Sequence, residues 1–304
     1  MTVGSLAKKV FSPSGGGKGG VYYPSTGIDY LSVCLGEAVL DYGGDIQLNS
    51  KVTEIIDRGR TKEVIFQKQG EAMSVAADFL ISTMPIRPLI EILKPMPADL
   101  LDAAGGLKSR TLFTLFLMVD RKSVTKHGCI YFSENKFPFK RMTEFRNLSP
   151  NTAPENKTGL CIEMTRGEHE VIKDVSDSKA VYDQAMAALE KEGFFRESDV
   201  IDYEVKTIPF AYPVYDMSYL KKLVAILGHL AGVKNMVTLG RNGLFTYNTM
   251  ANSIRSAHML GQRLAESGSE SIDDIVSGFY STRVEKYTRV PFGEAYRPNQ
   301  MFIE

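Results

Sequence analysis

Apolar residues recur at helical spacing in several segments of the chain. This pattern predicts helices whose apolar faces span residues 31–39, 181–189, 219–230 and 250–264. Ser25 or Thr26 is the expected N-terminal cap of the first helix, and Gly43-Gly44 its end. Residues 86–107, which contain three prolines, predict further short helices.

Short runs of β-branched and aromatic residues predict the strands. They span residues 45–48, 52–56, 63–66, 78–81, 112–119, 129–132, 141–145, 159–164, 202–208 and 235–239. Asp57, Arg58 and Gly59 predict a hairpin turn between the second and third strands. The run 112–119 is almost continuously apolar, which is typical of a strand buried on both of its faces.

This mixture of helices and strands indicates an α/β (α+β) protein. A chain of 304 residues exceeds the usual size of one domain, so two lobes are expected. One lobe is expected to be discontinuous, with an incomplete parallel sheet built from residues 21–95 and 233–304. The other lobe, residues 96–232, is expected to hold an antiparallel sheet flanked by helices.

The first twenty residues predict a flexible Gly-rich start. Gly15, Gly17 and Gly20 match the spelling of a GxGxxG dinucleotide motif. That motif requires a strand before it and a helix after it, whereas prolines stand on both sides here. A flexible loop is therefore the favoured interpretation of residues 1–20.

Composition excludes some classes of partner. Lysine plus arginine equals aspartate plus glutamate, so bulk charge gives no support for binding nucleic acid. No apolar run reaches the ~18 residues that a membrane span needs, and the start lacks the apolar region of a secretory signal, so the cytoplasm is the expected location. Cys34, Cys129 and Cys161 are scattered and are expected to be buried free thiols.

Four blocks in a fixed order resemble one enzyme family. They are YPSTG with the following helix, GG and NSKVTEI (residues 23–55), ISTMP (81–85), AYPVY (211–215) and LGRNGLFTYNTMANSI (239–254). Together they resemble the flavin-dependent oxidoreductases of the amine-oxidase, protoporphyrinogen-oxidase and UDP-galactopyranose-mutase type. The resemblance covers nearly all of residues 20–290.

This resemblance implies an FAD/NAD(P)-binding-like lobe over 21–95 and 233–304, and a substrate lobe over 96–232. It implies FAD as the cofactor, with Val52 at the adenine edge, Thr83 and Pro85 near the diphosphate and ribose, and Gly240 and Arg241 beside the diphosphate and ribityl chain. The start of the helix near Met250 would face the flavin's pyrimidine edge, and Gly27 would let backbone approach the ring.

The chain departs from the family pattern in two places. The family begins with a strand, GxGxxG and an acidic residue; without these the chain resembles the later two-thirds of the family, with a truncated Rossmann unit. The family pattern has an aspartate and one further residue after the methionine that matches Met250. Here Ala251 and Asn252 stand at those two positions.

The resemblance implies FAD-dependent oxidation of a small-molecule substrate by hydride transfer to flavin. A mutase-like isomerase that uses reduced flavin is one alternative. A truncated, non-catalytic or split flavoprotein fragment is another alternative. The expected protein partner is then a separate N-terminal chain that completes the fragment, or a second copy of this chain in a homo-oligomer.

The substrate pocket has four candidate residues: Arg141, Tyr212, Tyr215 and Tyr247. The tyrosines are alternatively core residues. Arg141 and Arg146 flank Glu144 either as an anion clamp or on a solvated strand face. The fragment Glu168-His169-Glu170 lacks a second histidine at helical spacing, so no metal site is expected, and no catalytic acid–base pair is identified.

Overall fold

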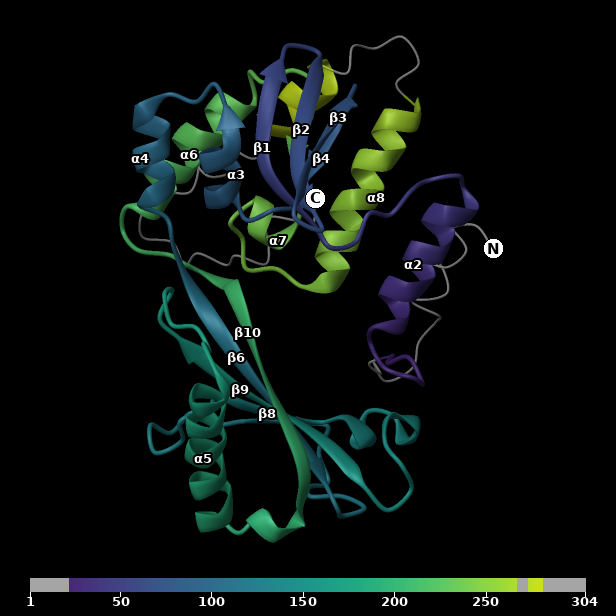
Figure 1. The fold of residues 1–304 in the computed structure, drawn as a ribbon, viewed down its shortest axis with the longest axis vertical. Helices are drawn as coiled ribbons and strands as arrows, with labels where there is room; N and C mark the ends of the chain where they lie inside the picture. Colours follow the sequence, from purple (N-terminus) through teal and green to yellow (C-terminus); the bar gives the residue numbers. More distant parts are fainter. Residues whose placement is uncertain (1–21, 267–272, 281–304) are drawn as a thin grey trace, which may run out of the picture. The chain divides into compact units, whose positions relative to one another are not determined.

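The computed structural model describes residues 22–266 and 273–280, and the predicted Gly-rich start lies outside them. The chain forms two compact units (Figure 1). Of the described residues, unit 1 holds 22–48, 112–166 and 170–208, and unit 2 holds 49–111, 167–169, 209–266 and 273–280. In this division residues 22–48 group with unit 1, and residues 96–111 and 209–232 group with unit 2, while the expected cofactor and substrate lobes stay a prediction.

Unit 2 contains a four-stranded sheet of order β3-β2-β1-β5. Its strands are β1 (Ser50–Arg58), β2 (Thr61–Lys68), β3 (Glu71–Ala77) and β5 (Leu93–Lys94). The predicted hairpin is confirmed: β1 and β2 are antiparallel, and Gly59 supplies the positive φ of the turn. The sequence did not predict β3, whose exposed polar and alanine-rich residues carry little strand signal.

A second sheet in unit 2 is a parallel pair, β4 (Leu80–Ser82) with β11 (Met236–Thr238). The helices of this unit are α3 (Ile86–Ile92), α4 (Ala98–Gly105), α6 (Tyr219–Leu230), α7 (Gly240–Gly243) and α8 (Met250–Glu266). Helix α4 packs against both α3 and α6 (Figure 1). One apolar core joins these elements with residues 273–280.

Unit 1 contains a five-stranded sheet of order β10-β6-β9-β8-β7. Its strands are β6 (Lys108–Val119), β7 (Cys129–Tyr131), β8 (Arg141–Glu144), β9 (Thr158–Arg166) and β10 (Val200–Val214). Helix α5 (Val175–Lys191) shares an apolar core with this sheet. The prediction for residues 112–119 is confirmed in that most of their side chains are buried. The chain passes between the units within β6 and within β10.

Helix α2 (Tyr30–Asp41) forms where the apolar spacing predicts a helix, and it groups with unit 1, but its details differ from the expectation. The N-cap is Asp29, not Ser25 or Thr26, and none of the helix's residues is buried. Residues 45–48 form no strand, so that prediction is wrong; the chain turns there and reaches Asn49 with a positive φ of 55°.

The interpretation of Glu144 as part of a solvated strand face is wrong. The Glu144 carboxylate is buried and accepts hydrogen bonds from the N–H groups of Val124 and Thr125 and from the Thr158 hydroxyl. Arg141 forms an ion pair with Glu163, while Arg146 donates to backbone carbonyls. Glu144 therefore organises the connection between β6 and β7, because a buried charge requires this many donors.

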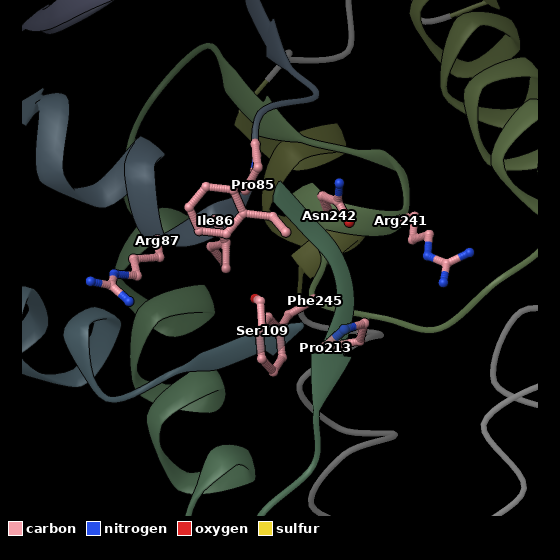
Figure 2. A pocket seen from close by; sticks show the side chains of 9 residues that line it. Pro85, Ile86, Arg87, Ser109, Pro213, Arg241, Asn242 and Phe245 are labelled. Atoms are coloured by element: carbon pink, nitrogen blue, oxygen red, sulfur yellow. The ribbon is translucent and has the colours of Figure 1, made fainter. Parts of the chain in front are cut away.

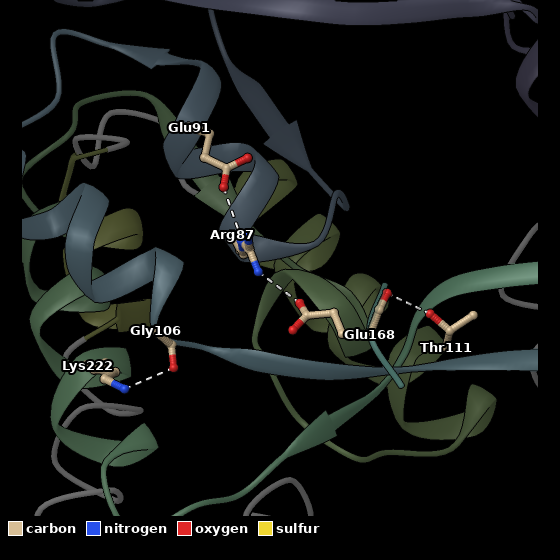
Figure 3. A network of polar contacts seen from close by, with 6 residues as sticks. All are labelled: Arg87, Glu91, Gly106, Thr111, Glu168 and Lys222. Carbon is tan, nitrogen blue, oxygen red and sulfur yellow. Dashed lines mark hydrogen bonds and ion pairs between the residues drawn. The ribbon is translucent and has the colours of Figure 1, made fainter. Parts of the chain in front are cut away.

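Residues 167–169 attach to unit 2 through Glu168 (Figure 3). Its carboxylate pairs with Arg87 of α3 at 2.9 Å, and its carbonyl accepts from the Thr111 hydroxyl at 3.0 Å. Arg87 also pairs with Glu91. The described part of the chain contains no group of acidic, histidine or cysteine residues that could hold a metal ion.

In residues 22–266 and 273–280, no helix has the length and apolar character needed to cross a membrane. The three cysteines are free thiols, as expected. Burial is confirmed for Cys161 only, since Cys129 is exposed and Cys34 is half-buried.

Candidate functional site

The carboxyl ends of β4 and β11 meet at one edge of the parallel pair. Ser82 lies opposite Thr238, and the Leu239 N–H donates to the Ser82 carbonyl at 2.8 Å. Thr83 and Pro85 leave β4 at this edge, and Gly240 and Arg241 leave β11 there. The structure thus brings these four predicted cofactor residues together at the edge where ligands bind in open parallel sheets.

Two glycines shape the turn after β11. Gly240 has a φ of 81° and open space where a side chain would begin, so backbone there is accessible to a ligand. Gly243 has the opposite surroundings: an added Cβ would lie 2.6 Å from the Thr238 hydroxyl and 3.4 Å from the Met84 carbonyl. Gly243 therefore allows α7 to pack closely against the ends of both strands.

Arg241 is the central charged residue at this edge. Its guanidinium carbon lies 4.8 Å from the Tyr212 ring centroid and 4.5 Å from that of Tyr247. Its Nη1 donates to the Asn248 carbonyl at 3.3 Å. Its Nε and Nη2 are buried and have no hydrogen-bond partner among the described residues.

The two unpartnered donors of Arg241 define what it can bind. Nε–H and the Nη2–H beside it point the same way and form the edge of a guanidinium that binds an oxyanion with two parallel hydrogen bonds. Leaving charged donors buried without acceptors is costly. The two tyrosine rings stabilise the cation but cannot accept hydrogen bonds in the plane of the guanidinium. The arrangement therefore fits a phosphate or carboxylate at Nε and Nη2.

The connection between α7 and α8 carries Tyr247, the second aromatic ring against the Arg241 guanidinium. Its Thr246 N–H donates to the Arg241 carbonyl at 2.9 Å, and its Tyr247 N–H donates to the Tyr215 hydroxyl oxygen at 2.6 Å. Burial raises the pKa of Tyr215 to about 12, so this hydroxyl is neutral at ordinary pH. Of the predicted pocket tyrosines, Tyr212 and Tyr247 thus contact Arg241, and Tyr215 contacts the backbone of Tyr247.

A small cavity lies at this edge, with Arg241 among the residues that line it (Figure 2). Its volume is about 10 Å³, and it is lined by residues that include Pro85, Ile86, Ser109 and Phe245. Figure 2 shows the Arg241 guanidinium extending away from Pro85 and Ile86. A cavity of this volume has room for about one water molecule, so it does not hold the ligand of Arg241.

The remaining predicted site residues lie elsewhere in the two units. In unit 2, Val52 is half-buried in β1, and Met250 is 48% exposed at the start of α8. In unit 1, Gly27 is a buried turn residue with a φ of 121°, and Arg141 pairs with Glu163. The roles of these four residues stay predictions.

The sequence did not point to Asn248 or to the packing role of Gly243. The Asn248 contact with Arg241 uses a backbone carbonyl, which any residue could supply, so no side-chain signal could have identified it. Gly243 stands in the Gly-Arg-Asn-Gly run, and its identity was the available signal. The close approach that requires glycine became visible only in three dimensions.

Comparison with solved structures shows what the fold resembles. A reduced UDP-galactopyranose mutase matches with a TM-score of 0.63 at 17% identity, over 85% of this chain and 56% of that one. A protein of Exiguobacterium sp. 255-15 assigned as a protoporphyrinogen oxidase matches with a TM-score of 0.58 at 13% identity, over 86% and 52%. A redesigned putrescine oxidase matches with a TM-score of 0.54 at 10% identity, over 86% and 53%. The chain spans about half the length of these structures.

No curated protein matches the sequence. The family model of flavin containing amine oxidoreductases matches residues 8–220, which is more than half of the chain. That stretch includes three of the four blocks that carry the resemblance, as well as Tyr212 and Tyr215 of the site. The chain therefore belongs to the flavin containing amine oxidoreductase family.

Proposed function

We propose that this chain takes part in an FAD-dependent oxidation of a small-molecule substrate, and that Arg241 binds a phosphate oxygen of the cofactor. The observation that carries the proposal is the pair of buried donors, Nε and Nη2 of Arg241, which have no partner among the described residues. A diphosphate supplies acceptors of matching geometry and opposite charge. Membership of a flavin-containing family supports flavin as the group that carries this diphosphate.

Several residues around Arg241 suit the same ligand. Gly240 leaves room for a phosphate to approach the backbone after β11. Thr83 is exposed after β4, at the same edge, where its hydroxyl can donate. These residues would hold the cofactor, with Arg241 offsetting the charge of the diphosphate. When bound, FAD supplies the redox chemistry by accepting a hydride from the substrate.

Helix α8 supports the proposed flavin end of the site. The Thr249 hydroxyl accepts from the Asn252 N–H at 3.3 Å, which caps the helix without using a charged side chain. The positive end of the helix dipole is therefore not neutralised by an acidic cap. A helix start of this kind favours negative charge nearby, which suits the pyrimidine edge of a flavin that gains electrons.

The proposal is tested by the visible absorption spectrum of the purified chain, before and after adding FAD and desalting. Wild type is expected to retain a flavin band. Arg241→Ala is expected to bind FAD on the order of 10- to 100-fold more weakly, because two charge-assisted hydrogen bonds are lost. Arg263→Ala is the matched control, since it removes the same charge from an exposed position on α8.

Two results would contradict the proposal. A folded wild-type chain that stays colourless with excess FAD would argue against an autonomous cofactor site. Equal FAD affinity in Arg241→Ala and Arg263→Ala would show that Arg241 does not contribute to binding. Circular dichroism of each variant separates these results from a loss of folding.

A mutase-like isomerase that uses reduced flavin is the second candidate. It is supported by the two tyrosines against Arg241, because an arginine between aromatic rings also suits the diphosphate of a sugar nucleotide. Turnover of a UDP-sugar with reduced flavin and no turnover with oxidised flavin would favour the isomerase. Bleaching of the flavin by an amine or a CH–CH substrate without oxygen would favour the oxidoreductase.

A further inference from the structure

Tyr215 is held by ring packing on α6 as well as by contacts with the connection after α7, to which its ring partner Phe245 belongs. It follows the last residue of β10 and precedes α6, where the Asp216 carboxylate accepts from the Ser218 N–H at 2.9 Å. Its ring packs against Tyr219, with centroids 4.7 Å apart, and edge-on against Phe245 at 6.2 Å. The Tyr215 hydroxyl is therefore a rigid acceptor at a defined position.

Tyr247 is more exposed to solvent than Tyr215. It is 48% exposed, and it lies in the non-helical residues between α7 and α8. Its ring nevertheless stacks against Tyr212, with centroids 5.7 Å apart, and contacts the Arg241 guanidinium. Burial alone does not hold an exposed aromatic ring in one orientation, so its backbone anchor matters. That anchor is the hydrogen bond from the Tyr247 N–H to the Tyr215 hydroxyl.

We propose that Tyr215 is a positioning residue of the Arg241 site, which holds Tyr247 against the guanidinium and thereby aims Nε and Nη2 at the bound anion. The inference rests on the proposed function, in which Arg241 binds a phosphate. Arg241 is also tied to the same connection, because its carbonyl accepts from Thr246 and its Nη1 donates to Asn248. Displacing the connection would therefore rotate the guanidinium and its free edge.

The action of Tyr215 is positional and not ionic. Burial keeps the hydroxyl protonated, with its pKa raised to about 12, so it carries no charge that could pair with Arg241 at neutral pH. Replacing Tyr215 by phenylalanine removes one acceptor and keeps the ring that packs on Tyr219 and Phe245. A change in anion binding would then report the position of Tyr247 and Arg241.

The experiment measures binding of FAD and of inorganic pyrophosphate by titration calorimetry in Tyr215→Phe. Affinity for both is expected to fall roughly 3- to 10-fold, the effect of one lost neutral hydrogen bond. Tyr219→Phe is the matched control, because it removes a hydroxyl from the same aromatic cluster, and its affinity is expected to stay unchanged. In an Arg241→Ala background, Tyr215→Phe is expected to cause no further loss.

Hydrogen exchange at the Tyr247 amide provides a readout that needs no ligand. Exchange is expected to be faster in Tyr215→Phe than in wild type and in Tyr219→Phe. Exchange at the Tyr247 amide that is the same in Tyr215→Phe as in wild type would overturn the positioning role. If wild type binds FAD or pyrophosphate, equal affinity in Tyr215→Phe would overturn it as well. If wild type binds neither FAD nor pyrophosphate, the proposed function fails, while the exchange result still decides whether Tyr215 holds Tyr247.

A second variant keeps the test informative if Tyr215→Phe does not fold. Tyr247→Ala removes the positioned ring at a half-exposed site and keeps the backbone N–H. It is expected to weaken pyrophosphate binding by a similar factor. Wild-type affinity in Tyr247→Ala would also overturn the proposal, because the ring that Tyr215 holds would then have no effect on Arg241.

Discussion

The hydroxyl oxygen of Tyr280 accepts a hydrogen bond from the backbone N–H of Thr238 at 2.7 Å, in the buried core of unit 2. In β11 the Leu239 N–H pairs with β4, so the Thr238 N–H belongs to the opposite edge of the strand. The Tyr280 hydroxyl thus accepts the hydrogen bond that the carbonyl of a further strand would accept in a wider sheet. This contact satisfies a strand-edge donor directly before the Gly240-Arg241 turn.

Removing that hydroxyl is expected to destabilise unit 2. Tyr280→Phe leaves the buried Thr238 N–H without its acceptor, which should lower the free energy of unfolding by about 1–3 kcal/mol. Chemical denaturation followed by circular dichroism measures the change. Tyr219→Phe, in the same unit, is expected to stay close to wild type; equal stability of the two variants would argue against the contact.

A methyl group at Gly243 is expected to separate α7 from the strand ends. The added Cβ would lie 2.6 Å from the Thr238 hydroxyl, so Gly243→Ala should cost about 1–3 kcal/mol of stability through overpacking. Gly228 of α6 is exposed and has open space around it, so Gly228→Ala should instead stabilise by roughly 0.5 kcal/mol. Both glycines lie in unit 2, and denaturation curves with the same sign for both variants would contradict this prediction.

The two carboxylates that share Arg87 are expected to contribute unequally (Figure 3). Glu168 is 16% exposed and Glu91 is 48% exposed, so solvent screens the second ion pair more. Glu168→Gln should lower the free energy of unfolding by about 1 kcal/mol, and Glu91→Gln by less than about 0.5 kcal/mol. The effect of Glu168→Gln should also persist better at high salt. A larger effect of Glu91→Gln in thermal denaturation would contradict this ranking.

The three cysteines are expected to differ in reactivity. Burial raises the pKa of the Cys161 thiol to about 12, and the charge of Glu163 acts in the same direction. A raised pKa lowers the thiolate fraction at pH 8, and the thiolate is the reactive form. Iodoacetamide at pH 8 should therefore label exposed Cys129 first and Cys161 only after unfolding, as measured by mass spectrometry of the peptides. Native labelling of Cys161 at the rate of Cys129 would contradict this expectation.

The sequence by itself determined most of the elements and the family. Helical spacing predicted α2, α5, α6 and α8, because their apolar residues recur with the 3.6-residue period of an α-helix. The Gly-Arg-Asn-Gly and Ile-Ser-Thr-Met-Pro blocks marked the two turns that the structure places at one edge of the parallel pair, and their role in a cofactor site stays a prediction. Strand β3 was not predicted, because pairing with β2 stabilises it and its own residues have little strand propensity.

Only the tertiary structure decided what the individual side chains do. Tyr212, Tyr215 and Tyr247 were equivalent candidates in the sequence, yet two of them contact Arg241 and the third holds a backbone N–H. Glu144 changed from an expected surface residue to a buried acceptor, because its donors come from distant parts of the chain. Local periodicity records which residues face a core, whereas hydrogen-bond partners and burial depend on contacts between segments that the sequence does not place side by side.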